Sequence, residues 1–277
     1  MTTRGAAAAM RLDHWLVARG LAATREEAQA AIMAGLVTVD ERTADKAGRR
    51  VGPGAKIVVR GPAREYASRG GVKLAAALDA FGLDVRGCVA VDLGASTGGF
   101  TDCLLRRGAA AVYAVDVGRG QLAWALRTDP RVVVLEGTNA RHLEPGDVGG
   151  ARDLVTADLA FISLRLVWPA IARIAAPGAD VVALVKPQFE AGRDAVGRGG
   201  VVRDPAVHAS VLGDVLRGAE AHGLRPAAVL PSPVTGPAGN IEYLAHLRCG
   251  GARPPALDVA AAVREAHLRH APGGDRP

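Results

Sequence analysis

The feature that most constrains this chain is an alternation of short apolar runs with helical stretches between residues 88 and 186. The runs are rich in Val, Ala and Leu, which is typical of strands buried on both faces. They span residues 89–93, 111–115, 132–135, 154–157 and 181–185. Helices are expected between most of them, at 100–107, 121–127 and 164–175. This order predicts an α/β fold with a doubly wound, mixed but mostly parallel sheet of the Rossmann-like kind.

Four charged residues lie at the ends of these runs, namely Asp92, Asp116, Asp158 and Lys186. Any one of them alone would be an ordinary polar residue at a strand end. Open α/β sheets bind their ligands at the carboxyl ends of the strands, so four such residues on one edge predict a functional site.

The segment from Asp92 to Phe100 predicts a loop that passes close to a ligand, because its three glycines permit close backbone approach. Its glycine spacing differs from the G-x-G-x-x-G fingerprint of dinucleotide-binding folds, and an NAD-dependent oxidoreductase is therefore the weaker alternative. A leading carboxylate suits the amino group and sulfonium of S-adenosylmethionine, and Asp116 could accept both ribose hydroxyls of an adenosine. The predicted cofactor residues are Asp92, Gly94, Ala95, Ser96, Thr97, Gly98, Gly99, Phe100, Asp116, Val117, Asn139 and Asp158.

A second set of charged residues, Lys73, Asp158, Lys186 and Glu242, is expected to converge on the same edge of the sheet. Lys73 lies in the first turn of a predicted helix, where a cation opposes the helix dipole. Its position therefore suggests a role beyond stability. The alternative interpretation of the four residues is a structural cluster of ion pairs.

The first quarter of the chain predicts a separate module of two short helices followed by strands at Val37–Val39 and Ile57–Val59. Thr24 and Glu27 form a capping box, and the pair Gly61–Pro62 indicates a domain boundary. Residues 1–72 hold 12 of the 34 Lys and Arg residues but only 7 of the 28 Asp and Glu residues. Nearly all of the net charge of +6 thus lies in this segment, which suggests a polyanion-binding module.

Composition excludes several other classes of protein. No apolar run approaches the roughly 18–20 residues of a membrane-spanning helix, and the first residues make a poor signal peptide. The three cysteines lack metal-ligand spacing and are expected to be reduced and buried. We therefore expect a cytoplasmic protein without a metal.

Two resemblances give these patterns a function. Residues 11–37 resemble the alpha-L RNA-binding fold of ribosomal protein S4, and the match lies in Arg11–Asp13, Leu21, Thr24–Glu26, Ala28, Ile32, Gly35 and Val37. The resemblance implies phosphate contacts by Arg11, Arg19 and Arg25, to which we add Arg69. The chain departs from the family at Asp40–Glu41, where Asn-Gly is usual.

From Tyr66 to about Leu247 the chain resembles the TlyA family of ribosomal RNA ribose 2′-O-methyltransferases, once called haemolysins and related to the FtsJ (RrmJ) methyltransferases. The matching segments are 68–74, 92–100, 115–122, 158–164, 186–190, 199–204 and 232–243. The resemblance implies S-adenosylmethionine as cofactor, ribosomal subunits as partners, and a catalytic tetrad formed by Lys73, Asp158, Lys186 and Glu242. Arg119 and Ala160 depart from the family pattern beside the expected cofactor pocket.

The predicted organisation is an RNA-binding domain at 1–62, a linker at 63–70, a methyltransferase domain at 71–250, and a helix with a tail at 251–277. In the implied reaction, a ribose 2′-hydroxyl attacks the sulfonium methyl in line. Lys186 orients or deprotonates that hydroxyl. The alternatives are a non-catalytic ribosome-assembly factor, a membrane-lytic haemolysin and a pseudouridine synthase. The modified nucleotide and the oligomeric state do not follow from the sequence.

Overall fold

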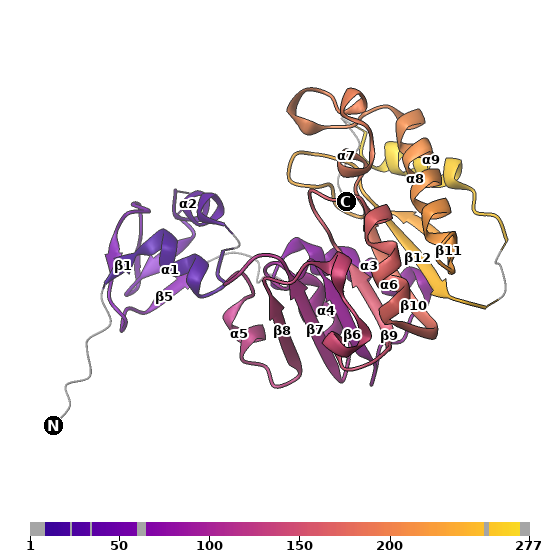
Figure 1. Ribbon diagram of the computed structural model, residues 1–277. Helices are drawn as coiled ribbons and strands as arrows, with labels where there is room; N and C mark the ends of the chain where they lie inside the picture. The colour runs from indigo at the N-terminus through magenta and orange to yellow at the C-terminus, as the bar shows by residue number, and fades with distance from the viewer. Residues whose placement is uncertain (1–8, 23, 34, 60–64, 252–254, 272–277) are drawn as a thin grey trace.

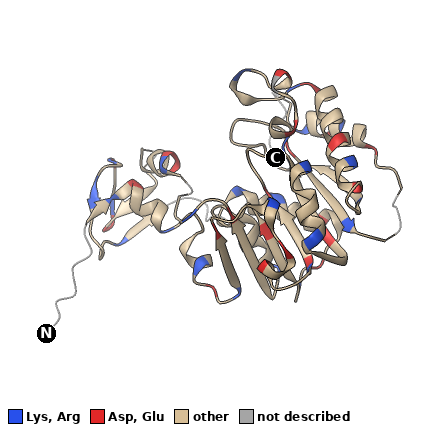
Figure 2. Ribbon diagram, viewed as in Figure 1, with Lys and Arg blue, Asp and Glu red and all other residues tan. Residues whose placement is uncertain are grey.

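A computed structural model describes residues 9–22, 24–33, 35–59, 65–251 and 255–271. The described residues form two bodies that follow one another in sequence, a small one at the N-terminal side and a larger one built on a single sheet (Figure 1). Figure 2 shows that both bodies carry basic and acidic residues. The predicted boundary at Gly61–Pro62 and the predicted tail from Pro272 lie outside the described residues.

The small body has two helices and two small sheets around one apolar core. Its central buried residues are Leu12, Leu16, Ala28, Ile32 and Val37. Thr24 accepts the Glu27 N–H at 3.2 Å, the helix start that the capping box predicts. Its elements are β1 (Met10–Arg11), α1 (Leu12–Ala18), α2 (Arg25–Met33), β2 (Val37–Val39), β3 (Arg42–Thr43), β4 (Arg50–Val51) and β5 (Ile57–Val59).

The turn between β2 and β3 has an unusual backbone for its sequence. Asp40 and Glu41 both have positive φ angles, 51° and 67°, which glycine or asparagine adopts more easily. Their side chains offset this cost, since Asp40 accepts the Lys56 N–H at 2.9 Å and Glu41 pairs with the Lys56 ammonium at 3.3 Å. The departure from Asn-Gly therefore keeps the turn and places two carboxylates beside one lysine.

The large body is a seven-stranded sheet of order β11-β12-β10-β9-β6-β7-β8. All pairings from β10 to β8 are parallel, and β12 runs antiparallel to both of its neighbours. The predicted mixed, mostly parallel sheet is thus confirmed. Its strands are β6 (Val89–Leu93), β7 (Ala111–Asp116), β8 (Val132–Glu136), β9 (Arg152–Ala157), β10 (Ala175–Val185), β11 (Leu224–Pro231) and β12 (Tyr243–Cys249).

Helices cover both faces of this sheet, which makes the fold doubly wound (Figure 1). The helices α3 (Arg69–Phe81), α4 (Gly99–Arg106) and α5 (Trp124–Arg127) share one apolar cluster with it. The helices α6 (Trp168–Ile174), α8 (Pro205–Glu220) and α9 (Val259–Arg269) share the other. Successive strand residues point to opposite faces, so Ala90 and Val91 of β6 belong to different clusters.

Two expected helices differ from the structure. The segment 164–175 is a 3₁₀ turn, η3 (Leu164–Leu166), followed by α6, and Ala175 already begins β10. Pro169 lies in the first turn of α6, where its missing N–H costs nothing, so the helix starts there rather than at residue 164. The helix expected at 121–127 is shortened to α5.

Candidate active site

A cleft of about 990 Å³ opens at the carboxyl ends of the parallel strands. The four residues of the predicted tetrad, Lys73, Asp158, Lys186 and Glu242, all line it. They come from α3, from the segment after β9, from the residue after β10 and from the residue before β12. Residues that are up to 169 positions apart in sequence therefore meet in one site.

The four charged groups form two ion pairs. Lys73 donates to the Glu242 carboxylate, and both side chains are buried. The Lys186 Nζ lies 2.5 Å from Asp158 Oδ1, with side chains that are 13% and 23% exposed. One pair is thus enclosed in protein, whereas the other remains open to a ligand in the cleft.

The glycine loop forms a wall of the cleft through Gly94, Ala95, Ser96, Thr97, Gly99 and Phe100. Gly94 has a φ of +82°, and a Cβ added there would lie 2.5 Å from the carbonyl oxygen of Asp158. Only glycine fits where the loop passes so close to the segment that follows β9, residues 158–164, which we call the Asp158 segment. Ser96 also has a positive φ of 48°, so the loop turns sharply twice beside the cleft.

Asp92 lies away from the cleft in the described structure. It is fully buried, because its position on β6 points to the same face as Ala90, toward α4. Its carboxylate accepts the hydroxyls of Thr101 at 2.7 Å and Thr156 at 3.0 Å. Burial raises the pKa of Asp92 to about 7, although the hydrogen bonds from Thr101 and Thr156 oppose this shift in part.

Asp116 ends β7 and is held in place by backbone groups rather than by other side chains. Its two carboxylate oxygens accept the N–H groups of Ser96 at 2.8 Å and Gly118 at 2.7 Å. Val117 beside it is 69% exposed. Asn139 caps a short 3₁₀ turn by accepting the Arg141 N–H at 3.1 Å. These residues and Gly98 are not among those lining the described cleft, and their cofactor role stays a prediction.

Two of the predicted RNA-binding arginines, Arg11 and Arg25, contact the same buried carboxylate, that of Asp13. Asp13 is fully buried, and Arg11 donates two hydrogen bonds to its carboxylate, at 2.8 and 3.0 Å. Arg25 lies 3.4 Å from the same carboxylate. The hydrogen bonds from Arg11 foremost, and from Gln29 and the His14 N–H, lower the pKa of Asp13 although its burial opposes this shift. Arg19 instead stacks on the Trp15 ring at 5.1 Å. Asp13 was already part of the Arg11–Asp13 match, but nothing in the pattern indicated that it would organise two arginines.

Arg69 is exposed at the start of α3 and lines the cleft. Residues of the small body, among them Val17 and Gly20, line it as well. A cluster of three or more His, Cys, Asp or Glu residues suited to a metal ion is absent from the described residues. Among the helices described, none is long and apolar enough to span a membrane.

The fold and the cleft define the class of protein. Residues 66–249 match the family model of FtsJ-like methyltransferases. Residues 10–57 match the model of the S4 domain. The chain is therefore a methyltransferase that carries an RNA-binding S4 domain ahead of its catalytic domain, as the sequence predicts.

Full-length relatives narrow this class. The 16S/23S rRNA (cytidine-2′-O)-methyltransferase TlyA of Mycobacterium tuberculosis is 52% identical, over 86% of this chain and 89% of its own length. YqxC of Bacillus subtilis is 48% identical, over 93% of this chain and 94% of its own length. A solved structure from Streptococcus thermophilus has a TM-score of 0.74 and 42% identity, over 94% of this chain and 96% of that chain. The chain belongs to the TlyA family of FtsJ-like methyltransferases, which confirms the resemblance.

Proposed function

We propose that this enzyme transfers a methyl group from S-adenosylmethionine to a ribose 2′-hydroxyl of ribosomal RNA. The observation that carries the proposal is the pair of lysine–carboxylate contacts facing the glycine loop across one cleft. The similarity to an rRNA (cytidine-2′-O)-methyltransferase supports ribosomal RNA as the substrate. A substrate in ribosomal subunits implies a cytoplasmic enzyme.

The residues around the cleft fit S-adenosylmethionine. The loop from Gly94 to Thr97 lines the cleft, and its glycine backbone would allow a ligand to approach closely. The Asp158 carboxylate also lines the cleft and is partly exposed. Asp116 would accept the ribose hydroxyls after exchanging its contacts with the Ser96 and Gly118 N–H groups. When bound, S-adenosylmethionine supplies a methyl group already activated on a sulfonium.

The chain's own residues then align the acceptor hydroxyl and handle its proton. Alignment of two bound reactants can contribute roughly 7–11 kcal/mol in favourable cases. Lys186 would orient the 2′-oxygen through Nζ and, in its neutral form, take the proton that this oxygen loses. Asp158 Oδ1 lies 2.5 Å from the Lys186 Nζ, and the buried Lys73–Glu242 pair lines the same cleft.

The presence of lysine rather than arginine at positions 73 and 186 supports a role in proton transfer. The chain has 34 Lys and Arg residues, and the four lysines are Lys46, Lys56, Lys73 and Lys186. Two of these four line the cleft. Arginine is the better partner for a carboxylate in a purely structural pair, because its guanidinium donates bidentate hydrogen bonds. Lysine differs from arginine because its amine can act as a base once it is neutral, whereas guanidinium stays protonated in proteins.

Single-turnover methylation of ribosomal subunits tests this role. Lys186→Ala should lower the rate by about 10²–10⁴-fold, the usual contribution of a general base. Lys186→Arg should not restore it, because guanidinium stays protonated. Arg217→Ala, on the exposed surface of α8, removes a cation of equal charge as a control and should leave the rate unchanged. A Lys186→Ala rate close to wild type would mean that the tetrad is a structural cluster.

The alternative of a non-catalytic assembly factor lacks support, because the chain belongs to the FtsJ-like methyltransferases and its four tetrad residues line one cleft.

A further inference from the structure

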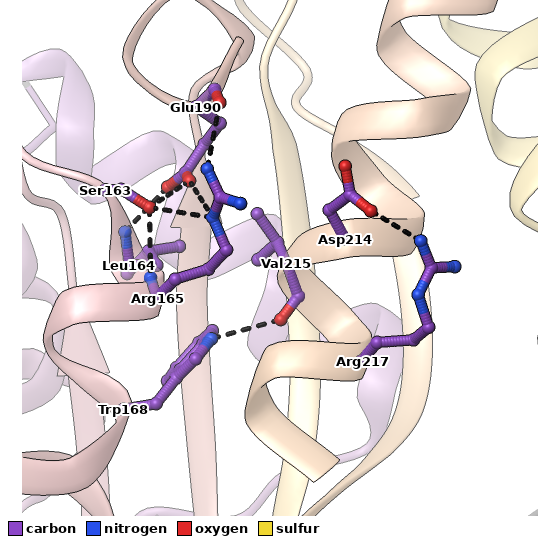
Figure 3. Close-up of polar contacts among 8 residues, drawn as sticks. All are labelled: Ser163, Leu164, Arg165, Trp168, Glu190, Asp214, Val215 and Arg217. Carbon is purple, nitrogen blue, oxygen red and sulfur yellow. Dashed lines mark hydrogen bonds and ion pairs between the residues drawn. The ribbon is translucent and has the colours of Figure 1, made fainter. Parts of the chain in front are cut away.

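The Asp158–Lys186 pair connects two neighbouring segments. Glu190 makes a second contact between the same segments, and it is not among the residues that line the described cleft. Asp158 follows β9, and Lys186 follows its parallel neighbour β10. Glu190 ends the short helix α7 (Pro187–Glu190). Its carboxylate accepts the Ser163 hydroxyl at 2.5 Å and the Leu164 N–H at 2.7 Å, both on the Asp158 segment (Figure 3).

The burial of Glu190 is costly for stability. Its side chain is 2% exposed, and this burial raises its pKa despite the two hydrogen bonds. The Arg165 Nε lies 3.8 Å from the carboxylate, but that side chain is 49% exposed to solvent. The cost is offset by the contacts with the Ser163 hydroxyl and the buried Leu164 N–H, which an apolar residue would leave without an acceptor. The carboxylate therefore ties its own segment to the segment that carries these two donors.

The Glu190 contact is the last of three between the same two segments. Asp158 contacts Lys186 at one end. The centroids of the Phe161 and Phe189 rings are 5.1 Å apart in the middle. Ser163 and Leu164 donate hydrogen bonds to Glu190 at the other end. Phe161 between them has a φ of +62°, a conformation that large side chains rarely adopt. A segment with such a backbone keeps its shape only where its surroundings fix it. The outer end of this segment is fixed by Glu190.

We propose that Glu190 is a positioning residue that holds the Asp158 segment so that its carboxylate meets the Lys186 ammonium before substrate binds. The inference rests on the proposed function for the role of Lys186 in methyl transfer. Glu190 is not among the residues lining the described cleft, so it acts through the two segments and not on the reacting atoms. Its loss should therefore lower kcat and leave the KM for RNA and for the cofactor unchanged.

Three variants separate positioning from folding. Glu190→Leu removes both acceptors, and its single-turnover rate should fall by up to about 100-fold, the penalty for a small misplacement of reacting groups. Glu190→Gln keeps the shape and one acceptor for the Leu164 N–H, and it should retain most of the rate. Asp214→Asn breaks the exposed ion pair with Arg217 in the same view, and it should change nothing (Figure 3).

The reactivity of the lysine amines gives a readout that does not depend on methylation. With only four lysines, trace acetylation followed by mass spectrometry can follow each amine separately. Glu190→Leu should raise the reactivity of Lys186 relative to the exposed Lys56, whereas Lys73, held by Glu242, should not change. If Glu190→Leu does not fold, Ser163→Ala, which removes one of the two contacts, should shift Lys186 in the same direction.

Unchanged Lys186 reactivity in these variants, with any loss of rate matching the loss of folded protein, would overturn the proposal. Failure of the proposed function is a different result, in which the wild-type chain methylates no ribose. The labelling experiment decides the role of Glu190 in that case as well.

Discussion

Replacement of Asp92 by asparagine should stabilise the catalytic domain at neutral pH and flatten its pH dependence. Asp92 is a residue of β6, and its fully buried side chain contacts Thr101 of α4 and Thr156 of β9. Burial is the main reason why its pKa is raised from 3.8 to about 7. The folded state therefore keeps a proton that the unfolded chain releases above pH 3.8. Asparagine resembles the protonated acid in shape and carries no charge, so it avoids this penalty at every pH.

The sign and size of the effect follow from proton linkage. Between the unfolded and folded pKa values the folded state binds more protons, so the stability contributed by Asp92 falls as pH rises. It falls by about 1.36 kcal/mol per pH unit, or at most about 4 kcal/mol over the whole window. The stability gained by Asp92→Asn should thus grow from pH 4 to pH 7 and stay constant above.

Urea unfolding at several pH values measures this difference. A Trp15→Phe background restricts the fluorescence signal to the catalytic domain, where the buried Trp168 reports on the core. A stability difference that does not vary between pH 4 and pH 7 would refute the linkage. Asp92→Asn should also keep its affinity for S-adenosylmethionine, because the carboxylate faces Thr101 and Thr156. A tenfold loss of affinity would instead support the direct cofactor contact predicted from the sequence.

Three further predictions concern the loop, the S4 domain and the tetrad. Gly94→Val should abolish S-adenosylmethionine binding by calorimetry, since its Cβ would meet the Asp158 carbonyl oxygen at 2.5 Å and φ is positive; normal affinity would show that the loop can move aside. Arg19→Gln should weaken ribosomal RNA binding and reduce the slope of log K against log salt by about 0.9, the value for one phosphate contact on duplex DNA; an unchanged slope would place the RNA elsewhere. Glu242→Gln should lower the methylation rate less than Lys186→Ala, because Glu242 contacts Lys73 and not Lys186; an equal loss would assign it a direct role.

The sheet could be predicted from sequence because its strands are buried on both faces and therefore read as apolar runs. The expected run 89–93 coincides with β6. The runs 111–115 and 132–135 stop one residue before the ends of β7 and β8, whereas 154–157 and 181–185 begin after the starts of β9 and β10. The tetrad could be predicted because parallel strands present their carboxyl ends at one edge. Pro169 is the sequence signal for the start of α6, because proline is tolerated in a helix only in its first turn, whereas the apolar periodicity continues across it.

The direction of single side chains was harder to predict. Asp92 opens the glycine loop in sequence, yet the alternation along β6 turns its carboxylate toward α4 and away from the cleft. Glu190 gave no pattern either, because its partners Ser163 and Leu164 lie on another segment. Arg11 is close to Asp13 in sequence, but Arg25 and Gln29 reach the same carboxylate from α2 only after folding. Such residues depend on tertiary packing, which local spacing does not encode.

In the proposed reaction the methyl group is transferred to a ribose oxygen of ribosomal RNA. To test this, unmethylated ribosomal subunits are treated with this enzyme and isotopically labelled S-adenosylmethionine, the RNA is digested to nucleosides, and the label is located by mass spectrometry. We expect label on a 2′-O-methyl ribose with wild-type enzyme and almost none with Lys186→Ala. Label on a nucleobase, or equal label with both enzymes, would contradict it.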